Sequence, residues 1–509
     1  MPVKFEIYRG GVRVKDFAPQ GAYAVGPESV PIPGAVTFQD GLLIADPPEV
    51  NAAGVALLWD LGELGSFHLE TTRLIPREKP YNLNVELARL RLMKIVQKQE
   101  DWNLFDFPKA DGFNQRLREA QDLFSDALGK MDQPAEAAML ADRSLALAVA
   151  LSEDLAMFHA ELLINRRRAT SAFVKHLFGC RVDFAMQNQR YREMLADSFD
   201  YAVLPMSWKL LQPQEGAFAP EVIDTWIDYL SKRRVPVLAG PIINLVERDV
   251  PDWMFIWEND FDSLREMVYE QVQRVVSRYR RSVVAWNVVG GLCTNSVFSL
   301  TFEQMIELTR LLVTLVKNTN SAARTLITIT QPFGEYHAHN PNSVSPMLYA
   351  EMLGQAGINF EGFAVELELG LPQPGMFARD LFQISTLLDR FSTIGRPVFL
   401  TAVSFPGRHT PDPADRTEGR MDPAAAGRWR RPWDPQLQAD FLEAVYRIAL
   451  SKPFVENVAW GNLVDVNQSV PGGGLLDEMY QPKPAFTRLQ ELRELFRAWQ
   501  AGKKQLQTP

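Results

Sequence analysis

The chain has 509 residues, which is too long for one ordinary domain and leaves room for two or three folding units. Apolar residues make up 46% and charged residues 23%, a balance that excludes a disordered or fibrous chain. The net charge of -9 argues against a nucleic-acid or anionic-membrane partner, because a phosphate-binding surface needs clustered Lys and Arg. With only Cys180 and Cys293, neither a disulfide framework nor a cysteine metal site is expected.

The N-terminal segment, MPVKFEIYRGGVRV, lacks the apolar stretch of about 7 to 15 residues that a signal peptide requires. No window approaches the roughly 18 apolar residues that suggest a membrane-spanning helix. As written, the chain is therefore expected to be cytoplasmic, and secreted if the true N-terminus lies upstream.

Residues 1–78 are predicted to form a small β-sandwich, which we interpret as carbohydrate-binding-like. Short β-type runs separated by Gly, Pro and Asp indicate this fold. The runs are Lys4–Tyr8, Gly11–Val14, Leu42–Ala45, Val55–Leu61 and Phe67–Thr72.

Residues 79–170 are predicted to form a helical brace between the sandwich and the next domain. Helical patterns cover Val85–Gln99, Asn114–Met131 and Ala135–Arg168, the last with Leu, Ala and Met at three- and four-residue steps. A break at Asp132 separates the second pattern from the third, so these two helices are expected to form an antiparallel hairpin.

Residues 171–500 change to short apolar β runs that alternate with amphipathic helices, as in parallel strands joined by helical crossovers. The predicted strands are Arg181–Met186, Tyr201–Leu204, Pro236–Ala239, Val283–Val289, Leu326–Thr330, Gly362–Leu367, Pro397–Val403 and Asn457–Gly461. The predicted helices are Gln189–Asp197, Pro220–Arg233, Asp262–Arg281, Thr301–Lys317, Pro346–Gln355, Ala378–Ile394, Gln436–Leu450 and Lys483–Ala501. Eight strand-helix units favour an α/β fold of the closed (β/α)8 TIM-barrel type over an open doubly wound sheet.

No Gly-rich phosphate loop follows any predicted strand, so a nucleotide enzyme is not expected and no cofactor is predicted. In a (β/α)8 barrel the chemistry lies at the C-terminal ends of the strands. The residues at those ends therefore carry the functional interpretation.

Short motifs at the strand ends resemble those of the xylanase-type glycoside hydrolases of family 10, over about residues 170 to 495. They are Trp208-Lys209-x-x-Gln-Pro-x-x-Gly216, Pro251-Asp252-Trp253, Trp286-Asn287-Val288-Val289, Gly395-Arg396-Pro397 with Thr401, Trp460-Gly461, and Leu475-Leu476-Asp477 followed by Pro482-Lys483-Pro484-Ala485-Phe486. Their common order and spacing carry the resemblance. It implies a (β/α)8 fold and cleavage of β-1,4-linked xylan with retention.

The resemblance places a Glu acid/base at the end of strand four and a Glu nucleophile at the end of strand seven. Strand four reads Trp286-Asn287-Val288-Val289-Gly290-Gly291 and strand seven reads Thr401-Ala402-Val403-Ser404, so Gly291 and Ala402 occupy these positions. Supporting motifs also differ, at Gly240-Pro241, Pro205-Met206-Ser207 and Glu366-x-Glu368. Because neither Gly nor Ala donates a proton or attacks carbon, the usual family mechanism is not expected.

Three acids remain near neighbouring strand ends: Glu335, Glu366 and Glu368. Glu366 and Glu368 are two residues apart on an extended strand, so they are expected to face the barrel mouth together. Neighbouring carboxylates raise one pKa, so we hypothesise that Glu335 and one of the other two form a relocated acid and nucleophile. The alternative is that these acids bind sugar hydroxyls, or pair with Arg379 and Lys209, without chemistry.

His337 and His339 follow Glu335 in an E-x-H-x-H pattern, and His and carboxylate are common zinc ligands. The segment has Asn and Pro beside it, so we interpret it as polar surface and predict no metal site.

Trp residues near the predicted C-terminal face suit a saccharide partner, because flat apolar rings stack on sugar faces. They are Trp208, Trp253, Trp286, Trp429, Trp433 and Trp460, of which Trp286 and Trp460 lie within strands and are equally expected in the core. Trp429 and Trp433 lie in a long loop, Pro406–Pro435, that we predict to be a movable lid. The predicted saccharide contacts are Trp208, Lys209, Asn244, Asn287, Trp429, Trp433 and Trp460.

Two functions of different classes follow from these residues. The first is a carbohydrate-active enzyme that acts on a β-linked, xylan-type polysaccharide with displaced carboxylates. The second is a catalytically inactive barrel that binds saccharide or a protein partner. A purely structural subunit fits less well, because such a barrel has no reason to line its mouth with Trp and acids.

Overall fold

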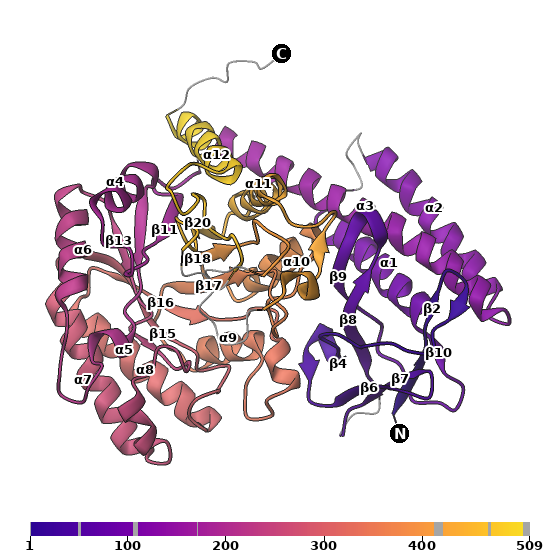
Figure 1. Ribbon diagram of the computed structural model, residues 1–509, viewed down its shortest axis with the longest axis horizontal. Helices are drawn as coiled ribbons and strands as arrows, with labels where there is room; N and C mark the ends of the chain where they lie inside the picture. Colours follow the sequence, from indigo (N-terminus) through magenta and orange to yellow (C-terminus); the bar gives the residue numbers. More distant parts are fainter. Residues whose placement is uncertain are drawn as a thin grey trace.

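The computed structural model describes residues 2–48, 52–104, 110–170, 172–411, 421–466 and 470–501. Figure 1 shows a β-rich N-terminal region and three helices on one side of the molecule and an α/β barrel on the other. In these residues no helix is both long and apolar enough to cross a membrane.

Eight parallel strands form the barrel, and the predicted fold class is confirmed. The strands are β11 (Phe178–Arg181), β12 (Tyr201–Leu204), β13 (Val237–Ala239), β15 (Val283–Gly290), β16 (Arg324–Ile329), β17 (Gly362–Glu368), β18 (Val398–Ser404) and β20 (Val455–Trp460). Each pairs with the next in parallel, and β20 pairs with β11, which closes the sheet on itself. The short strand β14 (Ile243–Asn244) pairs with the end of β15.

Side chains fill the barrel interior. The interior layer contains Tyr201, Val203, Leu238, Ala285, Leu326, Ala364, Phe399 and Ala459. Gly179 on β11 makes room for the ring of Tyr201, because a Cβ at this position would lie 2.3 Å from the ring atom Cζ. A ligand is therefore restricted to the rim, and the rim at the C-terminal strand ends is called the mouth below.

The barrel helices lie close to their predicted positions. They are α4 (Gln189–Ser198), α6 (Glu221–Lys232), α7 (Phe261–Tyr279), α8 (Phe302–Thr319), α9 (Pro346–Gln355), α10 (Leu381–Ser392), α11 (Pro435–Ser451) and α12 (Pro484–Gln500). Capping boxes begin two of them, Thr301 with Gln304 at α8 and Asp380 with Gln383 at α10.

The predicted first barrel strand begins three residues too late. The observed strand ends at Arg181, the residue at which the predicted strand begins. β11 covers Phe178–Arg181, and the chain turns at Asp183, whose carboxylate accepts a hydrogen bond from the Ala185 backbone N at 2.8 Å. A short polar side chain that bonds the backbone two residues ahead favours a turn over a strand.

The N-terminal region contains two sheets and a small hairpin. One sheet has the order β10 (Tyr81–Asn82), β1 (Val3–Glu6), β7 (Leu42–Asp46) and β6 (Ala35–Gln39). The other has the order β19 (Arg428–Trp429), β9 (Gly65–Glu70), β8 (Gly54–Asp60), β4 (Tyr23–Val25) and β5 (Pro31–Ile32), and β2 (Tyr8–Arg9) pairs with β3 (Val12–Arg13). β19 comes from the barrel loop after β18, so this sheet combines strands of the N-terminal region with one from the barrel.

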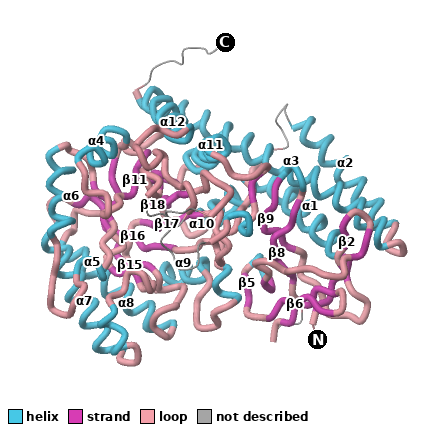
Figure 2. Tube along the Cα trace, in the orientation of Figure 1, coloured by secondary structure: helices cyan, strands magenta, loops and turns pink. Residues whose placement is uncertain are grey.

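Three helices connect this region to the barrel: α1 (Leu83–Asp101), α2 (Ala110–Gly129) and α3 (Pro134–Ala169). α2 and α3 lie side by side after a short turn, and α1 packs against them (Figure 2). α3 also packs against α10 and α11, and Arg167 at its end donates to the carbonyls of Leu450 and Lys452 at 2.7 and 2.9 Å. The helices therefore hold the β-rich region against the barrel.

Candidate functional site

Two carboxylates lie on the same side of β17 at the mouth. Ala364 of β17 belongs to the interior layer, so Glu366 and Glu368, two and four residues later, continue on that side. Glu366 is buried and lies in register with Ala402 on β18, and Glu368 lies in register with Ser404. The expectation that Glu366 and Glu368 face the mouth together agrees with this geometry.

Two arginines lie near enough to these carboxylates to influence them electrostatically. Arg181 ends β11, and Arg248 follows β14. Burial raises the pKa of Glu366, Arg181 opposes this shift, and Glu368 adds to it. Burial lowers the pKa of Arg248, but the carboxylates of Glu368 and Glu366 outweigh this effect and raise the pKa above its ordinary value. We call Arg181, Arg248, Glu366 and Glu368 the mouth cluster.

The end of β15 holds no side chain. Gly291 has a φ of +74°, and a Cβ built on it would lie 2.7 Å from the carbonyl carbon of Leu245. Leu245 N donates to Gly290 O at 3.0 Å, which holds the segment after β14 against this strand end. Backbone thus fills the space into which a side chain at position 291 would extend.

Glu335 lies away from the mouth cluster, and the predicted pair with Glu366 or Glu368 is wrong. Its carboxylate forms an ion pair with Arg379, accepts from Gly375 N at 2.6 Å and lies 4.0 Å from His68 Nδ1. The electrostatic neighbours of Glu366 are Arg181, Glu368, Arg248 and Asp249. None of the residues that contact Glu335 is among these neighbours of Glu366. The segment after β16, which carries Glu335, packs instead against β4 and β5 of the N-terminal region.

The alternative interpretation of Glu335 is supported, since it is 1% exposed and paired with Arg379. Lys209, the other cation expected to pair with these acids, forms an ion pair with Asp252 at 2.5 Å instead.

Four tryptophans predicted as sugar platforms are buried, which corrects that prediction. Trp208, Trp429, Trp433 and Trp460 are at most 3% exposed. Their indole N–H groups donate to Gln212 Oε1, Glu153 Oε1, Gly427 O and Gly473 O, respectively. A ring that is packed on both faces has no surface left for a sugar.

The part of the Pro406–Pro435 loop that carries Trp429 and Trp433 is packed against the N-terminal region and α11, contrary to the predicted lid. β19 extends the sheet beside β9, with Arg428 paired to Ser66 and Trp429 to Gly65. Trp429 and Trp433 both pack on Phe441 of α11, with ring centroids 5.0 and 5.6 Å apart. Residues 412–420 of this loop lie outside the described residues.

The predicted amide contacts have structural partners. Asn287 is 1% exposed, and its Oδ1 accepts from Thr328 Oγ1 at 2.7 Å, so it belongs to the barrel wall. Asn244 Nδ2 donates to Asp249 Oδ2 at 2.7 Å, which links it to the mouth cluster through a neighbour of Glu366.

Sequence reasoning missed Arg181 and Arg248. The predicted first strand begins at Arg181, although Arg181 is the last residue of β11. A charged side chain at the C-terminal end of a barrel strand is the signal that a correct strand boundary would have given.

Metal coordination has no candidate among the residues that the structure places: no group of three His, Cys, Asp or Glu side chains there is arranged to hold an ion. In the E-x-H-x-H segment, His337 Nδ1 lies 2.9 Å from Ser343 Oγ.

Comparison with known proteins agrees with the strand-end motifs. Residues 166–310 match the family model for Glycosyl hydrolase family 10. Endo-1,4-beta-xylanase B of Thermotoga neapolitana is 20% identical over 305 residues, which are 57% of this chain and 78% of that protein. Endo-1,4-beta-xylanase A of Caldicellulosiruptor sp. (strain Rt8B.4) is 28% identical over 89 residues, or 16% of this chain and 13% of that protein.

Among solved structures, native xylanase 10B from Thermotoga maritima aligns with a TM-score of 0.49 and 16% identity, over 65% of this chain and 98% of that one. The family match begins at the end of α3 and continues into α8, and so includes the strands that end at Arg181 and Gly290. By this match and its xylanase relatives, the chain carries a barrel that resembles glycosyl hydrolase family 10.

Proposed function

We propose that the mouth binds a β-linked, xylan-type glycan and does not cleave it by the two-glutamate mechanism of family 10. The observation that carries this proposal is the mouth cluster itself. It gathers Arg181, Arg248, Glu366 and Glu368 at one rim, while Gly291 and Ala402 leave the ends of β15 and β18 without a carboxylate. The names of the xylanase relatives support the choice of glycan.

The mouth cluster is suited to sugar hydroxyls. Carboxylates accept hydrogen bonds from them, and a guanidinium group donates in a fixed fork geometry. Charge-assisted hydrogen bonds of this kind are stronger than neutral ones, so a few groups can orient a chain of sugars.

Cleavage with retention needs two carboxyl groups about 5 to 5.5 Å apart, one to protonate the leaving oxygen and one to attack the anomeric carbon. Glu366 and Glu368 come from one strand and interact with the same Arg248. This arrangement favours binding over attack from the opposite side of a sugar ring.

Hydrolysis by Glu366 and Glu368 is the second candidate function. The raised pKa of Glu366, caused by burial, is what a general acid requires, and the neighbouring Glu368 would act as nucleophile or base.

Calorimetric titration of the full chain with xylohexaose and cellohexaose tests binding, and release of reducing ends from the same sugars tests turnover. We expect saturable binding with one site and no reducing ends above the blank. Glu366→Gln and Arg248→Met should each weaken binding at least tenfold, or about 1.4 kcal/mol.

Arg118→Gln serves as the control, because Arg118 is exposed on α2. Turnover that both Glu366→Gln and Glu368→Gln abolish would establish the second candidate instead. Binding of neither sugar would refute a glycan site at the mouth.

A further inference from the structure

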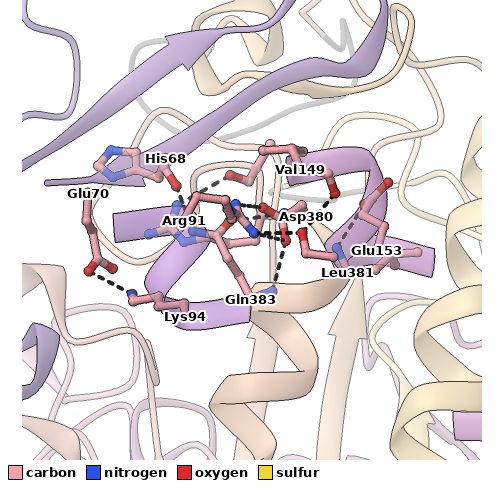
Figure 3. Close-up of polar contacts among 12 residues, drawn as sticks. His68, Glu70, Arg91, Lys94, Val149, Glu153, Asp380, Leu381 and Gln383 are labelled. Atoms are coloured by element: carbon pink, nitrogen blue, oxygen red, sulfur yellow. Dashed lines mark hydrogen bonds and ion pairs between the residues drawn. The ribbon is translucent and has the colours of Figure 1, made fainter. Parts of the chain in front are cut away.

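A cavity of about 320 Å³ lies where the N-terminal β region, α1 and α10 meet. Figure 3 shows part of its wall, with His68 and Glu70 from β9, Arg91 and Lys94 from α1, and Gln383 from α10. Its volume is at the lower end of the range for small-molecule sites, about 300 to 1,000 Å³, and such sites often lie at domain junctions.

Two helices present one face each to this cavity. Leu87, Leu90, Arg91, Lys94, Gln97 and Lys98 of α1 recur at three- and four-residue steps. Gln383, Thr386, Leu387 and Arg390 of α10 have the same spacing. Residues with this spacing lie above one another on one helix face, so each helix contributes a continuous wall.

Positive charge exceeds negative charge in the lining. Its cationic side chains are Arg91, Lys94, Lys98, Arg379 and Arg390, and its acidic ones are Glu28 and Glu70. Glu70 is already bound to Lys94, with 3.0 Å between Nζ and Oε2. The acids that pair with Arg91 and Arg379 are Asp380 and Glu335, which do not line the cavity.

Arg390 and Thr386 have unused hydrogen-bonding capacity. Across the part of the chain that the structure describes, Arg390 has no acidic side chain within ion-pair distance, and Thr386 Oγ1 is buried without a hydrogen-bond partner. They are four residues apart on α10, so both groups point to one place in the wall.

The rest of the lining is apolar or neutral. Leu69, Leu87, Leu90, Phe333, Phe382 and Leu387 contribute apolar surface. Burial, with Arg379 nearby, lowers the pKa of His68 well below its usual value, so its imidazole is neutral. A ligand here would meet both the guanidinium group of Arg390 and the apolar side chains of the lining.

We propose that this cavity binds a small carboxylate with an apolar body, its carboxylate held by Arg390 and Thr386. The site uses none of the mouth residues, and the proposal is independent of glycan binding. A bound molecule would contact the β region, α1 and α10 together, so it would stabilise the docked arrangement by a free energy that grows with the logarithm of ligand concentration over Kd.

The test is calorimetric titration and thermal unfolding of the full chain with benzoate and 3-phenylpropionate. Benzamide, 3-phenylpropionamide and inorganic phosphate are the matched probes that lack the charge or the apolar body. We expect at least one carboxylate to bind with one site and to raise the Tm, with its amide and phosphate at least tenfold weaker.

Arg390→Gln should lower the affinity for the carboxylate at least tenfold, and Leu90→Trp, which fills the cavity from α1, should abolish binding. Arg118→Gln on α2 should leave affinity unchanged. The Tm of each variant without ligand shows whether it folds.

Failure of both carboxylates to bind at 10 mM would overturn the proposal, as would equal binding by folded Arg390→Gln. Phosphate binding as tight as the carboxylate would overturn the requirement for an apolar body. Glycan titration of Leu90→Trp should match wild type, which separates this site from the mouth.

Discussion

Gly291 adopts a backbone conformation that L side chains rarely adopt, and Leu245 closes the space beside it. The absence of a carboxylate at the end of β15 is therefore built into the backbone and is not only a change of one side chain. Restoring a glutamate at this position would require the segment after β14 to move.

Gly291→Ala tests this packing. A left-handed conformation costs a non-glycine residue about 1 to 2 kcal/mol, and displacement of Leu245 adds to it, so the free energy of unfolding should fall by at least about 2 kcal/mol. Urea denaturation measures the change. Gly354→Ala on α9 is the control, because a Cβ there meets no atom within 4 Å, and this change should be neutral or stabilising. Equal effects of the two substitutions would contradict the account of position 291.

Glu153 of α3 makes stability depend on pH. Its Oε1 accepts from Leu381 N at 3.0 Å and from Trp429 Nε1 at 2.8 Å, and burial, with Asp380 nearby, raises its pKa from 4.5 to about 7. Because the folded state binds this proton more tightly, the contribution is complete below pH 4.5 and is lost as the pH rises through 7.

We expect the stability of wild type relative to Glu153→Gln to fall between pH 5 and pH 8, by up to about 3 kcal/mol. Urea denaturation at several pH values measures both curves. Glu119→Gln, an exposed change on α2, should run parallel to wild type. If the free energy of unfolding of Glu153→Gln changes with pH in the same way as that of wild type, the pKa of the Glu153 carboxyl is not raised.

Single-residue predictions from the sequence succeeded where strand geometry decides and failed where long-range packing decides. Glu366 and Glu368 share a side because residues alternate along a strand, and this needs no knowledge of the rest of the fold. Glu335 and Trp429 were assigned to the mouth because they follow barrel strands in sequence. Their partners Arg379, His68 and Glu153 come from distant segments, and no local pattern indicates those contacts.

β19 is an element that joins the barrel loop to the N-terminal sheet. Trp429 packs against Phe441 and donates to Glu153, so it connects β9, α3 and α11. Trp429→Ala should lower the free energy of unfolding by about 3 to 5 kcal/mol, the usual range for removing a buried aromatic side chain. Chemical denaturation measures it. Trp253→Ala at the half-buried rim should cost clearly less, and the reverse order would contradict the role of β19.

Elements with strong local patterns were predictable, and those that depend on distant partners were not. β12 and α9 have the predicted bounds, because a continuous apolar run and a Ser-Pro helix start determine them locally. β19 has two residues and exists through pairing with β9, more than 350 residues earlier in the chain, so no periodicity reveals it.

At the scale of the molecule, buried charges join the N-terminal β region and helices α1 to α3 to the barrel. Arg91 of α1 forms an ion pair with Asp380, the N-cap of α10, and both side chains are at most 5% exposed (Figure 3). Gln383 also donates to His68 O at 2.7 Å. Separation of this N-terminal part from the barrel would leave buried charges unpaired, which is strongly destabilising.

We therefore expect the β region, the helices and the barrel to unfold in one main calorimetric transition. Asp380→Ala should lower the Tm of that transition as a whole, because Arg91 loses its partner. Two resolved transitions in wild type, or a shift of only part of the signal in the variant, would contradict a single cooperative unit.

A crystal structure of the full chain soaked with xylohexaose tests glycan binding at the mouth most directly. We expect an uncleaved oligosaccharide at the C-terminal rim, within hydrogen-bond distance of Glu366 and Arg248. An empty mouth at saturating sugar, or a cleaved sugar beside Glu366 and Glu368, would contradict it.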